Sequence, residues 1–173
     1  MARMVWKRLR PEELAAFRER LDALTPKERP VYGLIGVEAS WWTRLGGPAR
    51  PFVVLFRGDR VILYKRSWRG RHAVSRRQYK SDDLQRVKVR RGPLLESARL
   101  WFADGYSVRV GSLPRHQSGP VELFLAEGPA AFDPSRLTPE QLTNTCLAWE
   151  ALGLPAGAGQ LPGGCPPDPG GRH

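Results

Sequence analysis

The strongest constraint on the fold is the alternation of apolar residues on both sides of Asp104-Gly105. Apolar side chains occupy every second position before and after this pair, at Ala98, Leu100 and Phe102 and then at Tyr106, Val108 and Val110. An alternation of period two is typical of a strand with one buried face, and Asp-Gly favours the tight turn of a β-hairpin. The stretch therefore predicts two antiparallel strands, each with one apolar face.

About seven short antiparallel strands are expected in residues 31–112, which is typical of a sandwich or a small barrel. Turn signals at Gly58-Asp59 and Gly92-Pro93 separate several of them. The expected strands are residues 31–42, 52–56, 61–64, 72–79, 84–90, 98–102 and 106–110. Within the first strand, Gly33 and Gly36 are expected to allow a bend.

A helix is expected before the strands. Pro11 suits its first position, acids follow in the first turn, and Thr25-Pro26 ends it. Its apolar face comprises Leu14, Phe17, Leu21 and Leu24. This spacing is typical of a helix that packs on the side of a domain.

Two helices are expected after the strands. A short one covers residues 120–127 and is closed by Gly128. The second has stronger signals, because Thr138 suits the N-cap, Pro139 the first position, and Gln141 completes a capping box. Its apolar face comprises Leu142, Cys146, Trp149 and Leu152, which we expect to pack against the sheet. Either helix suits the closure of one opening of the sheet, with the other as an addition.

Positive charge is concentrated in residues 65–91, which contain eleven Lys and Arg residues and two acids, a net +9 out of +11 for the chain. In Arg86-Val87-Lys88-Val89-Arg90, a strand places the valines on one face and the three cations on the other. A folded sheet with a positively charged outer face is therefore expected. GC-rich coding also enriches a protein in Arg, but clustering of the charge argues against coding as the full explanation.

We predict that this charge engages an anionic partner, either a protein or a phosphate-bearing one. The residues expected to contact it are Arg66, Arg69, Arg71, Arg76, Arg77, Arg86, Lys88 and Arg90. An acidic protein surface, an anionic lipid headgroup and nucleic acid all fit, because Arg suits bidentate contacts with carboxylate and phosphate. Trp68 and Tyr79 lie among the cations, as stacking on unpaired bases requires. Alternatively, Trp68 caps a barrel and Tyr79 belongs to the core.

The order of these signals in residues 52–113 resembles that of bacterial pleckstrin-homology-like (PH-like) domains. Those families show an apolar strand, a turn with an acid and Arg, and a second apolar strand, and residues 53–64 read VVLFRGDRVILY. A basic linker follows, and then an aromatic residue, an Asp and an aliphatic residue that opens the next strand, here YKSDDLQRV at 79–87. Arg57 departs from the small polar residue usual there. The resemblance implies an α+β fold with a bent antiparallel sheet or partial barrel, but no particular ligand.

One domain with additions is expected for a chain of 173 residues. The expected parts are a basic lead and helix at 1–30, the PH-like β domain at 31–128, a C-terminal helix packed on it at 129–154, and a disordered Gly- and Pro-rich tail at 155–173.

Catalysis is not expected. The three histidines, His72, His116 and His173, lie far apart in the sequence, and no spacing matches a zinc site or a phosphate-binding glycine loop. We therefore predict a non-catalytic binding or adaptor module with no cofactor. Cys146 and Cys165 make a poor disulfide framework, no apolar run approaches the ~20 residues of a membrane span, and the start lacks a secretory signal. A cytoplasmic protein is expected.

Overall fold

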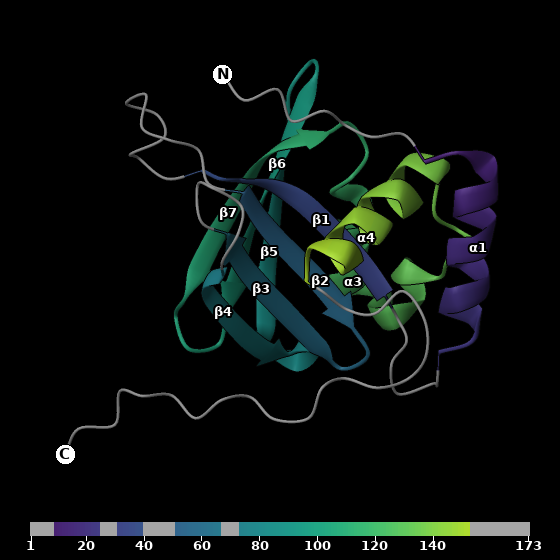
Figure 1. Cartoon of the computed structure of the whole chain (residues 1–173). Coiled ribbons are helices and arrows are strands. Elements are labelled where there is room, and N and C mark those ends of the chain that lie inside the picture. The colour runs from purple at the N-terminus through teal and green to yellow at the C-terminus, as the bar shows by residue number, and fades with distance from the viewer. Residues whose placement is uncertain (1–8, 25–30, 40–50, 67–72, 153–173) are drawn as a thin grey trace.

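The computed structural model describes residues 9–24, 31–39, 51–66 and 73–152 (Figure 1). Its strands are β1 (Val31–Glu38), β2 (Pro51–Arg57), β3 (Arg60–Arg66), β4 (Ala73–Lys80), β5 (Leu84–Arg91), β6 (Leu95–Phe102) and β7 (Ser107–Pro114). Its helices are α1 (Pro11–Asp22), α3 (Gly119–Glu127) and α4 (Pro139–Ala151), and its 3-10 turns are η1 (Ser81–Asp83) and η2 (Gly128–Phe132). A strand or helix thus lies at each position where the sequence predicts one.

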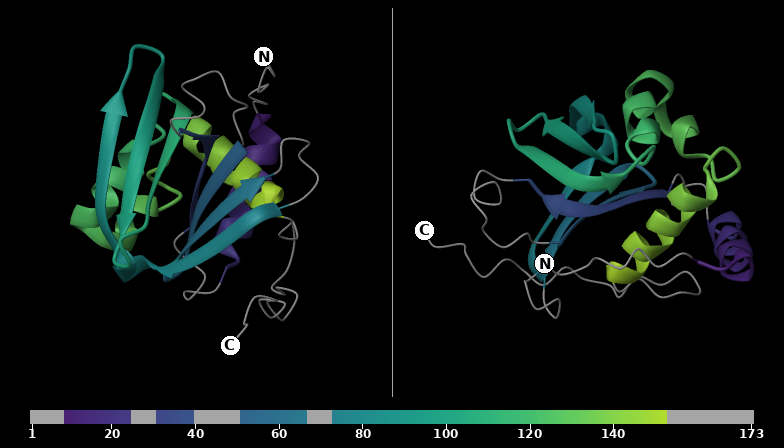
Figure 2. Two further views of the ribbon diagram at one scale, coloured as in Figure 1. Left: turned by 90° about the vertical axis from the view of Figure 1, so that its left-hand side faces the viewer. Right: turned by 90° about the horizontal axis from the view of Figure 1, so that it is seen from above.

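The seven strands form one antiparallel sheet in the order β4-β3-β2-β1-β7-β6-β5. Two meanders, β1–β4 and β5–β7, are joined where Val37 and Glu38 of β1 pair with Gly111 and Val110 of β7. The sheet curls at this junction, so that the meanders face each other as a half-barrel (Figure 2). With a helix before the strands and helices after them, the chain has the predicted PH-like α+β fold.

The concave side of the half-barrel holds the aromatic core. Tyr32 of β1 and Phe56 of β2 are fully buried there. Phe132 of η2 stacks on Tyr32, with ring centroids 5.2 Å apart, and lies 4.7 Å from the Phe56 ring. Phe124 of α3 packs against the same ring at 5.4 Å. Hence α3 and η2 close the concave side, which settles which of the two C-terminal helices does so.

The second helix, α4, lies on the opposite face of β1 and β2, and the right-hand view of Figure 2 shows β1 between α3 and α4. A Cβ atom on Gly33 would be only 2.4 Å from the Cβ of Ala148 on α4. The Gly33 amide also donates to Thr145 Oγ1 at 3.1 Å. Glycine is therefore needed at position 33 for the close approach of a helix, a role that the sequence did not indicate.

Gly36 plays a similar role where β1 meets β7. A Cβ atom there would lie 2.4 Å from the Gly111 carbonyl oxygen and 2.6 Å from the Val110 side chain. Only a residue without a side chain lets the two strands approach at the junction of the meanders. Both glycines are thus required by tertiary contacts of their strand.

The capping signals of α4 are confirmed. The Gln141 amide donates to Thr138 Oγ1 at 3.3 Å, and the Thr138 amide donates to Gln141 Oε1 at 2.9 Å. Leu142 and Cys146 are buried, and Trp149 is half-buried, with the Arg57 guanidinium 5.1 Å from its ring centroid. The α4 residues that meet β1 at Gly33 are Thr145 and Ala148. In the part of the chain that the structure describes, no helix combines the length and apolarity that crossing a bilayer requires.

Candidate anion-binding face

The outer face of the β5–β7 meander carries most of its charge. Residues 98, 100 and 102 of β6 and residues 108 and 110 of β7 are buried inward, so the residues between them point outward. We call these outward residues the basic face: Arg86, Lys88, Arg90, Ser97, Arg99, Trp101, Ser107 and Arg109. Five are cations and none is an acid.

Three cations of the basic face lie in one row across the strands. Lys88 of β5 pairs with Arg99 of β6, and Arg99 pairs with Arg109 of β7. Like charges directly opposite each other on a sheet are destabilising. Hydroxyl groups fix the two guanidiniums, since Arg99 donates to Ser107 Oγ at 3.1 Å and Arg109 to Ser97 Oγ at 3.2 Å. Each Arg has five N–H donors, so Arg99 has donors beyond the one that Ser107 accepts.

Four of the five cations of the basic face are exposed. Arg86, Lys88, Arg90 and Arg99 are solvent-accessible, and no acid among the described residues forms an ion pair with any of them. The neighbouring Arg91, by contrast, is paired with Glu122 of α3. The positive charge of these four residues is therefore not neutralised by an ion pair within the described part of the protein.

Trp101 lies within this field of charge. It pairs with Arg86 across β5 and β6, and its ring is half-buried. The Arg86 and Arg99 guanidinium carbons are 5.1 Å and 4.9 Å from the ring centroid. Both distances are within the range of a cation–π interaction. The ring and two guanidiniums thus form a group of planar side chains on the outer surface.

The structure brings together three of the predicted contact residues, Arg86, Lys88 and Arg90. Arg76 and Arg77 do not join them, because five strands separate β4 from β5 in the sheet order. These two also point to opposite faces of β4, with Arg77 over the Tyr106 ring at 4.2 Å on the concave side. Arg66 ends β3, where only its backbone is described. Arg69 and Arg71 lie outside the described residues.

The two aromatic residues singled out in the sequence have other positions. Tyr79 stacks on the buried Phe102 at 4.1 Å, and its hydroxyl donates to Asp104 Oδ2 at 3.0 Å. It therefore belongs to the packing of the half-barrel. Trp68 lies outside the described residues. The aromatic residue among the cations is instead Trp101.

Sequence reasoning missed Arg99, Trp101 and Arg109, although the signal was present. The alternation that assigns Ala98, Leu100 and Val108 to the core assigns the residues between them to the other face. What the sequence could not show is that β6 and β7 place these side chains beside β5, because strand pairing is a tertiary contact.

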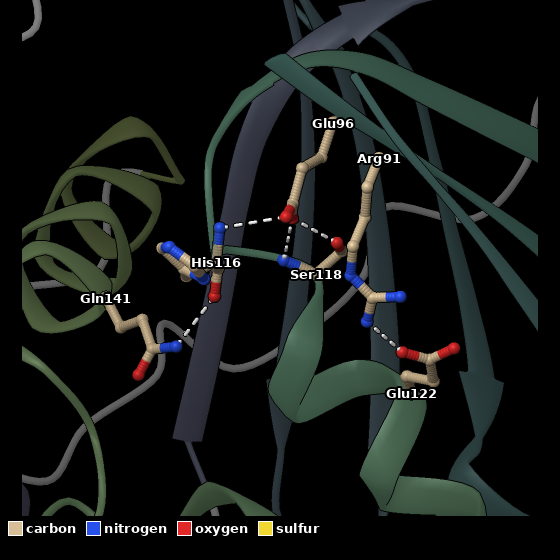
Figure 3. Close-up of polar contacts among 6 residues, drawn as sticks. All are labelled: Arg91, Glu96, His116, Ser118, Glu122 and Gln141. Atoms are coloured by element: carbon tan, nitrogen blue, oxygen red, sulfur yellow. Dashed lines mark hydrogen bonds and ion pairs between the residues drawn. The ribbon is translucent and has the colours of Figure 1, made fainter. Parts of the chain in front are cut away.

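A buried carboxylate holds one end of β6. Glu96 is only 5% exposed, and it accepts hydrogen bonds from the His116 amide at 2.9 Å, from the Ser118 amide at 3.1 Å, and from the Ser118 hydroxyl (Figure 3). Gln141 Nε2 of α4 donates to the His116 carbonyl at 2.7 Å. Glu96 therefore ties β6 to the turn that leads into α3. His116 is held there at φ 69°, a left-handed conformation that non-glycine residues rarely adopt.

Opposing effects act on the pKa of Glu96. Burial raises it, while the Ser118 hydroxyl, the His116 and Ser118 amides and the Arg91 charge lower it, and the net result is a lowered pKa. The carboxylate is thus ionised at neutral pH and fully engaged as an acceptor. A pocket of about 290 Å³ adjoins it, but its two arginines are already paired, Arg91 with Glu122 and Arg136 with Glu127. We therefore regard this cluster as structural.

No protein-family model matches the chain, and no curated protein matches its sequence. A solved structure that matches is the pleckstrin homology (PH) domain of USP37. It is 17% identical, covers 57% of this chain and 97% of that domain, and superimposes with a TM-score of 0.39. The class of fold is PH-like, as the strand order and the helices after the last strand show.

Proposed function

We propose that the protein is a non-catalytic binding or adaptor module whose basic face engages an anionic partner. The observation that carries this proposal is the row formed by Lys88, Arg99 and Arg109 across three strands. Each like-charge pair in such a row weakens the sheet, and no outward side chain of β5–β7 is an acid. An anionic ligand would relieve this repulsion, so the arrangement suits binding better than it suits folding.

An acidic protein surface or an anionic lipid headgroup fits the charge of this face, and nucleic acid is the alternative. Arg forms bidentate hydrogen bonds with carboxylate and phosphate alike. On an anionic membrane each cation near the surface contributes about 1 kcal/mol. Arg76 and Arg77 do not extend the basic face, and they are proposed as a separate set of contacts. Arg66, Arg69 and Arg71 remain proposed contacts as well.

A competing explanation is that the cations protect β5, which is an edge strand of the sheet. Charged side chains on an edge strand prevent it from pairing with other chains. Charge reversal separates the two explanations, because glutamates protect an edge as well as lysines do but repel an anionic partner.

The test compares two triple variants of the full chain. One carries Arg86→Glu, Lys88→Glu and Arg90→Glu, and the matched control carries Arg18→Glu, Arg20→Glu and Arg115→Glu, which are exposed residues away from the face. Both lose the same net charge. In pull-downs from cytosol, with and without nuclease, we expect the first variant to lose its partner and the control to retain it. Retention by both would show that the basic face is only a solvated surface.

A further inference from the structure

We infer that the anionic partner of the basic face is a single-stranded nucleic acid, with a base stacked at Trp101 and phosphates on the surrounding cations. The inference rests on the proposed function and specifies its ligand. It comes from the position of Trp101, whose ring lies near the guanidiniums of Arg86 and Arg99, beside the row of Lys88, Arg99 and Arg109.

The chemistry of these side chains favours unpaired bases. An aromatic ring on an open sheet gives a base a stacking surface without regard to sequence, and planar arginine side chains stack on bases as well. The basic face offers three such planar groups together, the Trp101 ring and the guanidiniums of Arg86 and Arg99. Carboxylates of an acidic protein would pair with the cations but would make no use of the tryptophan.

The shape of the face is also that of a single-strand site. Outward residues on one strand are about 6.8 Å apart, and adjacent strands about 4.8 Å, so Arg86, Lys88 and Arg90 form a line along the edge strand with Trp101 beside it. A flexible single strand can follow that line with its backbone and turn a base toward β6. A duplex keeps the faces of its bases stacked inside the helix and out of reach of the ring.

A membrane is less well matched to these residues. Among the eight residues of the basic face, Trp101 is the only apolar side chain, and it is half-buried beside two guanidiniums. The face therefore offers a bilayer charge but no aliphatic group to insert. Leu94 and Leu95 are 79% and 49% exposed, but they lie in the turn between β5 and β6 and at the first position of β6, beyond the last residues of the basic face.

The experiment measures fluorescence anisotropy of labelled oligothymidylate of about 12 nucleotides, within the site sizes known for single-strand-binding sheets. We expect the full chain to bind it more tightly than a duplex of the same length or vesicles containing phosphatidylserine. If all five cations contact phosphate, the logarithm of the affinity should fall with the logarithm of salt with a slope of about −3.5, and Lys88→Gln should reduce that slope by about 0.7.

Substitutions at Trp101 test the stacking itself. Trp101→Leu should weaken oligothymidylate binding about tenfold, within the range measured for loss of one stacked base. Trp101→Phe keeps an aromatic ring and should restore most of the affinity. Circular dichroism and a melting curve for each variant would show that the fold is retained, so that a loss of binding reports on the face.

The outcomes separate this inference from the proposed function. If Trp101→Leu binds oligothymidylate as tightly as the unmodified chain, contact is electrostatic only and the inference is wrong. It is also wrong if vesicles or an acidic peptide bind while oligothymidylate does not, although the proposed function would stand if the Arg86, Lys88 and Arg90 reversal abolished that binding. If the reversal and its control bind every probe equally, both proposals fail.

Discussion

Replacement of Glu96 by Gln should destabilise the protein strongly, although the two side chains have the same shape. The carboxylate accepts hydrogen bonds from two amides and one hydroxyl within a buried site. A Gln side chain keeps one acceptor oxygen and turns an NH₂ group toward the remaining donors. Hydrogen bonds to charged groups contribute about 1.5–3 kcal/mol each, so a loss of about 3 kcal/mol at neutral pH is expected.

Urea denaturation monitored by tryptophan fluorescence measures the free energy of unfolding of each variant. Glu96→Gln should lower this free energy without changing the m-value. For a chain of this size a loss of about 3 kcal/mol should lower Tm by about 6–12 °C. The matched control is Glu122→Gln, which removes an exposed ion pair with Arg91 and should cost less than about 1 kcal/mol. Equal losses for the two variants would contradict the role given to Glu96.

The pH dependence follows from the lowered pKa of Glu96. Because the pKa in the folded state lies below that of the unfolded chain, about 4.3, the carboxylate stabilises the fold fully above that value. This contribution is lost as the pH falls toward the lowered folded pKa. The difference in stability between the unmodified chain and Glu96→Gln should therefore shrink as the pH falls below about 4.3. A difference that stays constant to pH 3 would refute the reasoning.

The other predictions concern packing and the tail. Gly33→Ala should cost about 1–3 kcal/mol in urea denaturation, because its Cβ would overlap Ala148 on α4, whereas Gly119→Ala, which meets no atom within 4 Å, should be nearly neutral. A neutral Gly33→Ala would show that α4 shifts freely on the sheet. Deletion of residues 156–173, which lie outside the described part, should leave Tm nearly unchanged, as their Gly- and Pro-rich composition predicts. A clear fall in Tm would mean that the tail packs on the domain.

Local sequence patterns were sufficient to predict the strands and helices of this fold. The alternation around Asp104-Gly105 predicted β6 and β7, and the capping box at Thr138 and Gln141 predicted the start of α4. Such signals depend only on the periodicity of a strand or helix and on hydrogen bonds between near neighbours in the chain. The same periodicity placed Arg86, Lys88 and Arg90 on one outer face.

Tertiary structure alone decided how these elements meet. Pairing of β1 with β7 curls the sheet, α3 takes the concave side, and α4 packs on the opposite face at Gly33. These contacts join residues far apart in the chain, and no local pattern specifies them. For the same reason the residues of the candidate site differ from those predicted. Pairing of β5, β6 and β7 places Arg99, Trp101 and Arg109 near Lys88. Arg76 and Arg77 lie on β4, at the other end of the strand order.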